Sequence, residues 1–283
     1  MSTISPVPYI WYKFDTISST NVTNSGSAGA TLDGTLNNGA SVVNIDGPTG
    51  PTCLNLTNTT GKLSNDSSGQ YVSIPPFTLG GPFSVSCWFK KANANESHAR
   101  IFDFALAYGG EKELTLKFYH TTGMVIVGRQ DSNGNFTSSD FNDKNYCDNK
   151  WHHIAIVSNG SSLVFYLDNV KMKSVDFPPI ETVQRVNNYI GRSSYPDVYA
   201  TIQLDDFRLY TTPLSESDIA TVFNYKKQVS SIVPAPTNST LTNPSSITVT
   251  PINTTSTTVT SLTVTPINTT STTVTPLTVT SIN

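Results

Sequence analysis

The hydrophobic and polar positions in the first four-fifths of the chain follow a strand pattern. Short segments rich in β-branched and aromatic residues alternate with clusters of Gly, Asn, Asp, Pro and Ser, as expected of strands joined by turns. We predict strands over Tyr71–Ile74, Phe83–Phe89, Leu114–Tyr119, Met124–Gly128, Trp151–Val157, Leu163–Leu167 and Val170–Val175. Many short strands with almost no helical periodicity indicate an all-β sandwich or barrel.

Two local patterns add detail to this outline. Asp168 and Asn169 separate two predicted strands, and because both tolerate a positive φ they predict a two-residue hairpin turn. Within Ile202–Tyr210 the apolar positions change parity at the Asp205-Asp206 pair. Either both faces of this strand are covered or a β-bulge lies at the two aspartates.

One helix is predicted near the end of the varied part of the chain. Ser215 followed by Asp218 has the form of a capping box, in which each residue satisfies a backbone N–H at the start of a helix. Ile219, Val222 and Phe223 then form an apolar stripe. We therefore expect a helix of two or three turns that closes the folded domain.

The composition changes near residue 227 and divides the chain into three parts. Residues 1–8 form a short leader, residues 9–227 the sandwich, and residues 228–283 a tail rich in Ser and Thr. The tail repeats with a period of 15 residues, since Ser246–Thr260 and Ser261–Thr275 are nearly identical. It is interpreted as an extended stalk, or as a fibrous β shaft through which several chains oligomerise.

Charge and cysteine content exclude several classes of protein. Only 13% of the residues are charged and the net charge is −3, which favours neither nucleic acid nor an anionic membrane as partner. No apolar run is long enough to insert into a bilayer, and Met1–Phe14 has no recognisable signal peptide. Cys53, Cys87 and Cys147 are too few for a disulfide framework, although a bridge between two of them stays open.

Six sequence motifs, taken in order, point to a known family. They are Gly69–Pro75 (GQYVSIP), Phe83–Phe89 (FSVSCWF), Lys150–Val157 (KWHHIAIV), Phe165–Asn169 (FYLDN), Tyr189–Arg192 (YIGR) and Leu204–Tyr210 (LDDFRLY). Together they resemble the laminin G-like jelly-roll domains of the concanavalin A-like lectin/glucanase superfamily. The resemblance implies an antiparallel two-sheet jelly-roll sandwich with one short C-terminal helix.

The resemblance also implies a structural Ca²⁺ site between the first loop and the last strand. Asp15, Asn24, Asp205 and Asp206 are the residues that match such a site. Calcium prefers six to eight oxygen ligands from carboxylates, carbonyls and water. The alternative is that the aspartates are hydrogen-bonded within the protein and tie the loop to the strand.

Exposed aromatic side chains are the candidates for sugar binding, because a pyranose has an apolar face and a rim of hydroxyls. Tyr108 lies beside Gly109-Gly110, and Tyr195 and Tyr199 lie in a predicted loop over residues 193–200. Loops on a rigid sandwich commonly carry function.

No catalytic residue is predicted. His152 and His153 are neighbours on a strand, so their side chains point to opposite faces and are assigned structural roles. Glycosidases of this superfamily carry Glu-x-Asp-x-Glu on one strand, which this chain lacks. Glu111 and Glu113 are interpreted as a solvated strand edge.

The sequence therefore predicts a non-catalytic adhesion or carbohydrate-binding module on a stalk, with a glycan or glycoprotein as its partner. The expected location is extracellular, at a cell surface or on a virion. A structural protein that uses the sandwich as a packing domain is the main alternative, and a glycosidase-related enzyme is less favoured. Fold alone does not decide among these functions.

Overall fold

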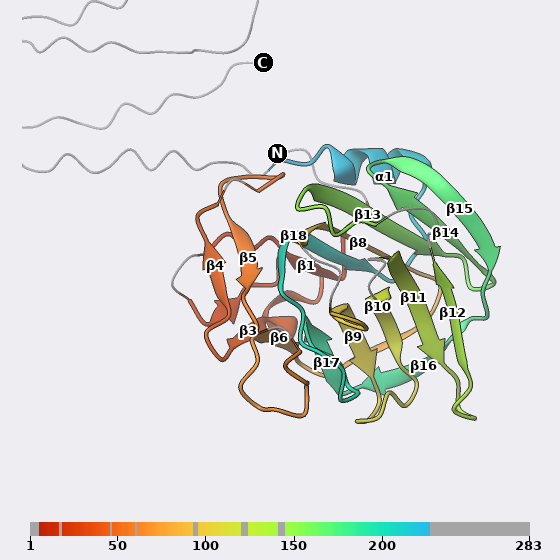
Figure 1. Cartoon of the computed structure of the whole chain (residues 1–283). Helices are drawn as coiled ribbons and strands as arrows, with labels where there is room; N and C mark the ends of the chain where they lie inside the picture. Colours follow the sequence, from red (N-terminus) through yellow and green to blue (C-terminus); the bar gives the residue numbers. More distant parts are fainter. Residues whose placement is uncertain are drawn as a thin grey trace, which may run out of the picture. The chain divides into compact units, whose positions relative to one another are not determined.

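The computed structural model describes residues 6–16, 19–45, 47–59, 61–92, 96–119, 124–140 and 145–226. They form two antiparallel sheets packed face to face, a small two-stranded sheet and one α-helix (Figure 1). The chain is an all-β two-sheet sandwich with one short C-terminal helix, as predicted. The tail over residues 228–283 lies outside the described residues.

The strands of the first sheet, sheet A, are β1 (Ile10–Tyr12), β4 (Ser41–Val43), β5 (Cys53–Leu56), β8 (Phe83–Lys90), β13 (Trp151–Ser158), β14 (Ser162–Leu167), β15 (Val170–Asp176) and β18 (Ile202–Tyr210). Their order is β15–β14–β13–β8–β18–β5–β4, and β1 also pairs with β18. Strand β8 therefore pairs with two strands that follow it in sequence by more than 60 and 110 residues, which requires long-range assembly.

The strands of the second sheet, sheet B, are β2 (Asn21–Val22), β3 (Gly34–Asn37), β6 (Tyr71–Ile74), β9 (Arg100–Ala105), β10 (Leu114–Tyr119), β11 (Met124–Gln130), β12 (Phe136–Asp140) and β17 (Asn187–Ile190). Their order is β12–β11–β10–β9–β17–β6–β3–β2. The two-stranded sheet pairs β7 (Phe77–Gly81) with β16 (Ile180–Arg185), and a short 3₁₀ helix covers Gly29–Leu32.

The hydrophobic core lies between the two sheets. Phe102 and Phe104 of β9 contact Phe207 of β18, with ring centroids 6.0 and 6.4 Å apart, and Phe89 of β8 contacts Phe118 of β10 at 5.6 Å. All five side chains are buried. Burying a side chain of this size contributes about 1.5–3 kcal/mol, so these rings stabilise the packing of the two layers.

Strand β18 contains the predicted bulge at the paired aspartates. Its register with β8 shifts between Asp205 and Arg208, and Asp206 has a φ of 54°. The extra residue changes the parity of the strand, so that Phe207 and Leu209 face the core while Arg208 faces outward. Both faces of β18 are also covered, so both alternatives drawn from its sequence pattern hold.

Helix α1 (Glu216–Phe223) covers the outer face of sheet A near β13 and β14 (Figure 1). The capping box forms as predicted, since the Ser215 side chain accepts from the backbone N–H of Asp218 and the Asp218 side chain accepts from that of Ser215. Ile219 and Val222 are buried against sheet A. In the part of the chain that the structure describes, no helix has the length and apolar character needed to cross a membrane.

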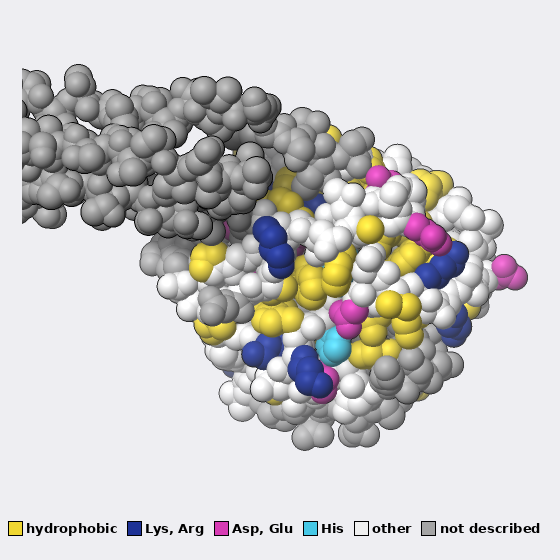
Figure 2. Space-filling model, turned by 90° about the horizontal axis from the view of Figure 1, so that it is seen from above, with side chains coloured by type: hydrophobic (Ala, Val, Ile, Leu, Met, Phe, Trp, Pro, Cys, Tyr) yellow, Lys and Arg dark blue, Asp and Glu magenta, His cyan; other side chains and the backbone are white. Residues whose placement is uncertain are grey.

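The face of the molecule near helix α1 combines hydrophobic and charged side chains. Figure 2 shows hydrophobic patches on this face that are interrupted by scattered Lys, Arg, Asp and Glu side chains. Within the described surface on this side, no single charge dominates.

Two smaller expectations are also settled. Asp168 and Asn169 have φ values of 49° and 65° and join β14 to β15 in the predicted hairpin. Cys53, Cys87 and Cys147 are all buried and no disulfide joins them. The cysteines therefore act as small side chains in the interior, and burial raises the pKa of the Cys147 thiol to about 11.

The two neighbouring histidines occupy different environments on opposite faces of β13. His153 is 0% exposed and lies between the rings of Trp88 and Phe223, at 5.1 and 5.5 Å. Burial, and to a lesser extent the positive charge of Arg208, lowers the pKa of His153 to about 3. His152 contacts Asp168 and Asp148, and its hydrogen bond to Asp168 is the main reason that its pKa is raised.

His153 should make the domain less stable in acid. The unfolded chain binds a proton at this histidine below about pH 6.5, whereas the folded domain binds it only near pH 3. The free energy of unfolding should therefore fall by up to about 1.4 kcal/mol per pH unit between these values because of His153. In urea titrations at several pH values, His153→Leu should show a shallower loss than the wild type.

His152→Gln is the matched control, because the folded state stabilises the protonated form of His152. Removing His152 should make the loss of stability on acidification steeper. An identical pH slope for the wild type and His153→Leu would contradict the buried neutral state of His153.

Candidate functional site

Tyr108 and Tyr195 come from different loops that contact each other at the outer face of sheet B. The backbone N–H of Gly109 donates to the carbonyl of Ser194 at 2.9 Å. The ring of Tyr195 lies against Gly110, where a Cβ atom would come within 2.0 Å of the ring. Tyr108 is 59% exposed, so it projects into solvent beside this contact. We call Tyr108 and Tyr195 the tyrosine platform.

The Tyr195 ring is held at its other end by a polar contact. Gln130 Nε2 donates to the Tyr195 hydroxyl at 3.2 Å. Burial is the main reason that the pKa of Tyr195 is raised, so the hydroxyl remains neutral over the physiological range. Tyr195 is half-buried, which fixes the ring while leaving part of it accessible.

A buried charged network fastens the loop that carries Tyr195. Arg100 forms ion pairs with Asp103 at 3.2 Å, Glu113 at 3.2 Å and Asp197 at 2.9 Å. Asp103 in turn accepts from the backbone N–H of Ser194 at 2.9 Å and from its hydroxyl at 3.0 Å. Because Arg100 and Asp103 are buried on β9, they anchor the loop to the sheet.

The structure corrects the interpretation of Glu113 as part of a solvated strand edge. Glu113 is buried, while Glu111 is exposed. Burial, followed by the neighbouring Asp103 carboxylate, raises the pKa of Glu113 well above its usual range. No local pattern around Glu113 indicates this environment, since Arg100 comes from a neighbouring strand. Glu111 and Glu113 do not share an accessible site.

Tyr199 is not available as a sugar-binding surface, contrary to the sequence-based expectation. It is 1% exposed, and its ring packs so closely on Gly69 that a Cβ there would lie 2.2 Å away. Its hydroxyl donates to the carbonyl of Asp66 at 2.7 Å, and its ring stacks on Tyr71. Its role is to pack the loop over residues 193–200 against the sheet.

Sequence reasoning missed a second group on the outer face of sheet B. The guanidinium carbon of Arg192 lies 4.7 Å from the ring centroid of Tyr71 and 4.7 Å from that of Tyr189. All three side chains are half-buried. The alternation of Tyr71–Ile74, with Val72 and Ile74 in the core, was the available signal, since it places Tyr71 on the outer face.

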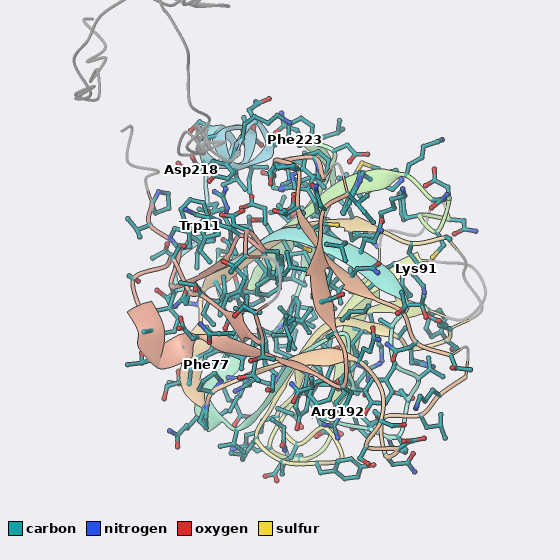
Figure 3. All side chains as sticks on the ribbon, turned by 90° about the vertical axis from the view of Figure 1, so that its left-hand side faces the viewer. Trp11, Phe77, Lys91, Arg192, Asp218 and Phe223 are labelled. Carbon is teal, nitrogen blue, oxygen red and sulfur yellow. The ribbon has the colours of Figure 1, made fainter. Side chains whose placement is uncertain are left out.

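Figure 3 shows Arg192 at the opposite end of the molecule from Phe223 of helix α1. Lys226, the last described residue before the tail, follows that helix directly. The outer face that carries Arg192 is therefore remote from the point where the described chain ends.

The residues of the implied calcium site are tied together by hydrogen bonds. The Asn24 side-chain oxygen accepts from the backbone N–H groups of Trp11 and Gly26, at 2.8 and 2.9 Å. Because both lone pairs of this oxygen are in use, the Asn24 side chain does not fit the role of a metal ligand. Asp205 accepts from the Thr49 hydroxyl at 2.6 Å, which ties a loop to β18.

Asp206 and Asp15 differ sharply in their surroundings. Asp206 is buried, forms an ion pair with Arg208 at 2.8 Å and accepts from Trp11 Nε1 at 2.7 Å. Asp15 is exposed and lines a hollow of about 210 Å³. Among the residues that the structure describes, no group of three His, Cys, Asp or Glu side chains is arranged to hold a metal ion. The contacts of Asp205 and Asp206 favour the alternative hypothesis, in which the aspartates are hydrogen-bonded within the protein and tie the loop to the strand.

The comparisons with known proteins agree with the fold. Residues 66–220, more than half of the chain, match the Laminin_G_3 family, described as the concanavalin A-like lectin/glucanases superfamily. The chain belongs to this family. No functionally curated protein matches it by sequence.

Several solved structures share the fold at low sequence identity. Domain 4 of the arabinanase AbnA from Geobacillus stearothermophilus, in complex with arabinotriose, is 18% identical with a TM-score of 0.60, and the match covers 76% of this chain and 98% of that chain. The binding domain of Paraclostridial Mosquitocidal Protein 1 is 16% identical, with a TM-score of 0.55 and coverage of 78% and 53%.

The ligand binding domain of botulinum neurotoxin serotype D, in complex with N-acetylneuraminic acid, is 14% identical with a TM-score of 0.56, and the match covers 77% of this chain and 50% of that chain. This chain thus spans about half the length of the toxin binding domains. At these identities the similarities establish the fold alone.

Chelation should distinguish the two roles of the aspartates. Because protein donors already bind Asp205 and Asp206, we expect a Ca²⁺ chelator to leave the melting temperature unchanged. Asp206→Asn should instead cost about 3–5 kcal/mol, with or without chelator, since it leaves Arg208 buried without its ion pair. A chelator-induced drop in melting temperature that Asp206→Asn abolishes would establish the calcium site instead.

Gly110→Ala should displace Tyr195, and Gly109→Ala provides a matched control. Both glycines have a positive φ, of 76° and 89°, but an added Cβ meets Tyr195 only at Gly110. Gly109→Ala should cost about 1–2 kcal/mol of unfolding free energy from backbone strain alone. In urea titrations Gly110→Ala should cost more, and equal losses would contradict the packing of Tyr195 on Gly110.

Proposed function

We propose that this domain is a non-catalytic module that recognises carbohydrate, as a free glycan or on a glycoprotein, through the tyrosine platform. The observation that carries the proposal is that the exposed Tyr108 and the half-buried Tyr195 lie on two loops that the Gly109–Ser194 hydrogen bond and the packing of Tyr195 on Gly110 hold together. An aromatic ring accommodates the apolar face of a pyranose, and neighbouring polar groups orient its hydroxyls.

Rigidity of the site supports binding over a purely structural role for these loops. The Arg100 network fastens the backbone of the loop with Tyr195 to β9, and Gln130 binds the Tyr195 hydroxyl. A side chain that is already ordered loses little conformational entropy when a ligand binds. Polar groups for sugar hydroxyls are close, since the Gln130 amide and the Tyr195 hydroxyl form one hydrogen-bonded pair.

The solved relatives offer indirect support for a sugar ligand. One relative of nearly the same domain length was solved with arabinotriose, and a toxin binding domain was solved with N-acetylneuraminic acid. A non-catalytic role accords with the buried state of Glu113 and with its separation from the exposed Glu111. By the same analogy we place the domain outside the cell, at a cell surface or on a virion.

Tyr108→Ala should weaken glycan binding about tenfold without destabilising the domain, because the ring is mostly solvent-exposed. A glycan array on the full chain identifies a ligand, and titration of that ligand against both proteins measures the effect. Tyr195→Ala should weaken binding as well.

Val170→Ala is the matched control, since Val170 is also 59% exposed but lies on β15 of sheet A. It should leave binding unchanged. Silence of the wild type across the array would favour the alternative, a structural protein that uses the sandwich for packing. Binding that survives Tyr108→Ala and Tyr195→Ala would place the sugar elsewhere.

A further inference from the structure

Arg192 differs in its electrostatic environment from Arg100 and Arg208, the buried arginines of the two large sheets that form ion pairs. Arg100 has three carboxylates as ion-pair partners, and Arg208 has Asp206. For Arg192, the described residues provide no carboxylate within ion-pair distance; its Nη2 donates to the carbonyl of Ser64 at 3.2 Å. A half-buried positive charge thus remains on the outer face of sheet B.

The guanidinium group is held in place by the rings of Tyr71 and Tyr189. Each ring centroid lies 4.7 Å from its central carbon, and the two rings meet edge to face at 5.6 Å. Cation–π contacts of this kind orient the planar group without neutralising its charge. An ordered guanidinium offers parallel N–H donors that match a carboxylate or sulfate.

Polar groups suited to a sugar lie on the strands that carry Tyr71 and Tyr189 and on the neighbouring strand. Tyr189 pairs with Ser73 across β17 and β6, and Ser73 pairs with Thr35 across β6 and β3, so three hydroxyl-bearing residues form one row on the outer face. The Tyr189 hydroxyl also donates to the Asn187 side chain at 3.2 Å. Hydroxyls and amides in such a row are able both to donate to and to accept from sugar hydroxyls.

Arg192 and Tyr195 of the tyrosine platform lie on the same fastened loop. Three peptide steps separate Arg192 from Tyr195, so their Cα atoms are no more than about 11 Å apart. The buried Asp103 and Arg100 hold Ser194 and Asp197 of this loop in place. A loop fastened in this way keeps the two residues at a fixed spacing, which suits binding of neighbouring units of one oligosaccharide.

From these contacts we infer that Arg192, framed by Tyr71 and Tyr189, is an anion subsite that makes the domain select glycans carrying a carboxylate or sulfate group. The inference rests on the proposed function, because the neutral sugar unit next to the anion subsite is bound by the tyrosine platform. A neutral sugar unit stacks at the platform, and the acidic group of an adjacent unit accepts hydrogen bonds from Arg192.

The test compares matched glycans that differ only in their acidic group. The full chain is titrated at low salt with a neutral oligosaccharide, its sialylated form and its sulfated form, beginning with lactose, 3′-sialyllactose and 3′-sulfolactose and extending to matched pairs on a glycan array. The acidic forms should bind at least about tenfold more tightly than the neutral one, a difference that shrinks as salt is raised. Comparing the sialylated and sulfated forms identifies which acidic group is preferred.

Variants separate the subsite from a general effect of charge. Arg192→Gln should abolish the acidic preference and leave neutral binding unchanged, and Arg192→Lys should restore only part of it because an ammonium lacks the planar donor pair. Lys13→Gln removes the same unit of charge near Trp11, which Figure 3 shows well away from Arg192, and should leave the preference intact. Tyr189→Phe keeps the ring that contacts Arg192 and should retain the acidic preference. The melting temperature of each variant is recorded, so that loss of folding is distinguished from loss of the subsite.

Each pattern of results has a distinct meaning. Equal binding of neutral and acidic glycans, or an acidic preference that Arg192→Gln leaves unchanged, overturns the anion subsite and leaves the platform standing. Acidic binding that requires Arg192 but is insensitive to Tyr108→Ala supports the subsite and overturns the platform. Silence towards every glycan pair overturns both.

Discussion

Strand β18 is buried on both faces, and most of this fold depends on that constraint. Its inner face places Phe207 against the aromatic side chains of sheet B, while its outer face carries Arg208 beneath the rings of Trp11 and Tyr225, at 4.4 and 4.5 Å. A charged residue tolerates that burial because Asp206 forms an ion pair with it. The bulge brings the two side chains to the same face.

Several distant parts of the chain are fastened at this one strand. The first strand, β1, pairs with it through Trp11, a loop near residue 49 attaches through Asp205, and the chain beyond α1 attaches through Tyr225. Asp206, Asp205 and Arg208 are thus the residues of β18 at which N-terminal, middle and C-terminal segments meet. These attachments explain why Asp205 and Asp206 occur in a strand whose core face is otherwise apolar.

Sheet B also contains charged side chains that tolerate burial because they pair with one another. Arg100, Asp103 and Glu113 are buried together, and the network holds a loop on the outer face rather than another strand. The loop presents Tyr195 and Arg192 from a rigid base, and Arg192 lies at the end of the domain remote from α1 (Figure 3). Preorganisation of this kind is what a recognition surface requires, since binding then costs little ordering of the protein.

The local structure of this domain follows from its sequence, because strand alternation, turn residues and helix caps act over a few positions. The sequence predicted β6 and β10 with their observed bounds, the Asp168-Asn169 hairpin, the capping box at Ser215 and the bulge at the aspartates. Family motifs in order then defined the two-sheet fold. Strand β9 was not predicted, because its charged Arg100 and Asp103 interrupt an otherwise apolar run and become compatible with burial only through their partners.

Which side chains are accessible and which charges are compensated depends on the folded arrangement of the chain. No sequence pattern distinguishes Tyr108 from Tyr199 as a sugar-binding candidate, yet Tyr108 is exposed and Tyr199 is covered by its contact with Gly69. Glu113 is buried because Arg100 lies on the adjacent strand, and Arg192 gains its tyrosine frame from two strands that are over 100 residues apart in sequence. Burial and electrostatic pairing depend on neighbours brought together by folding, and no local pattern encodes them.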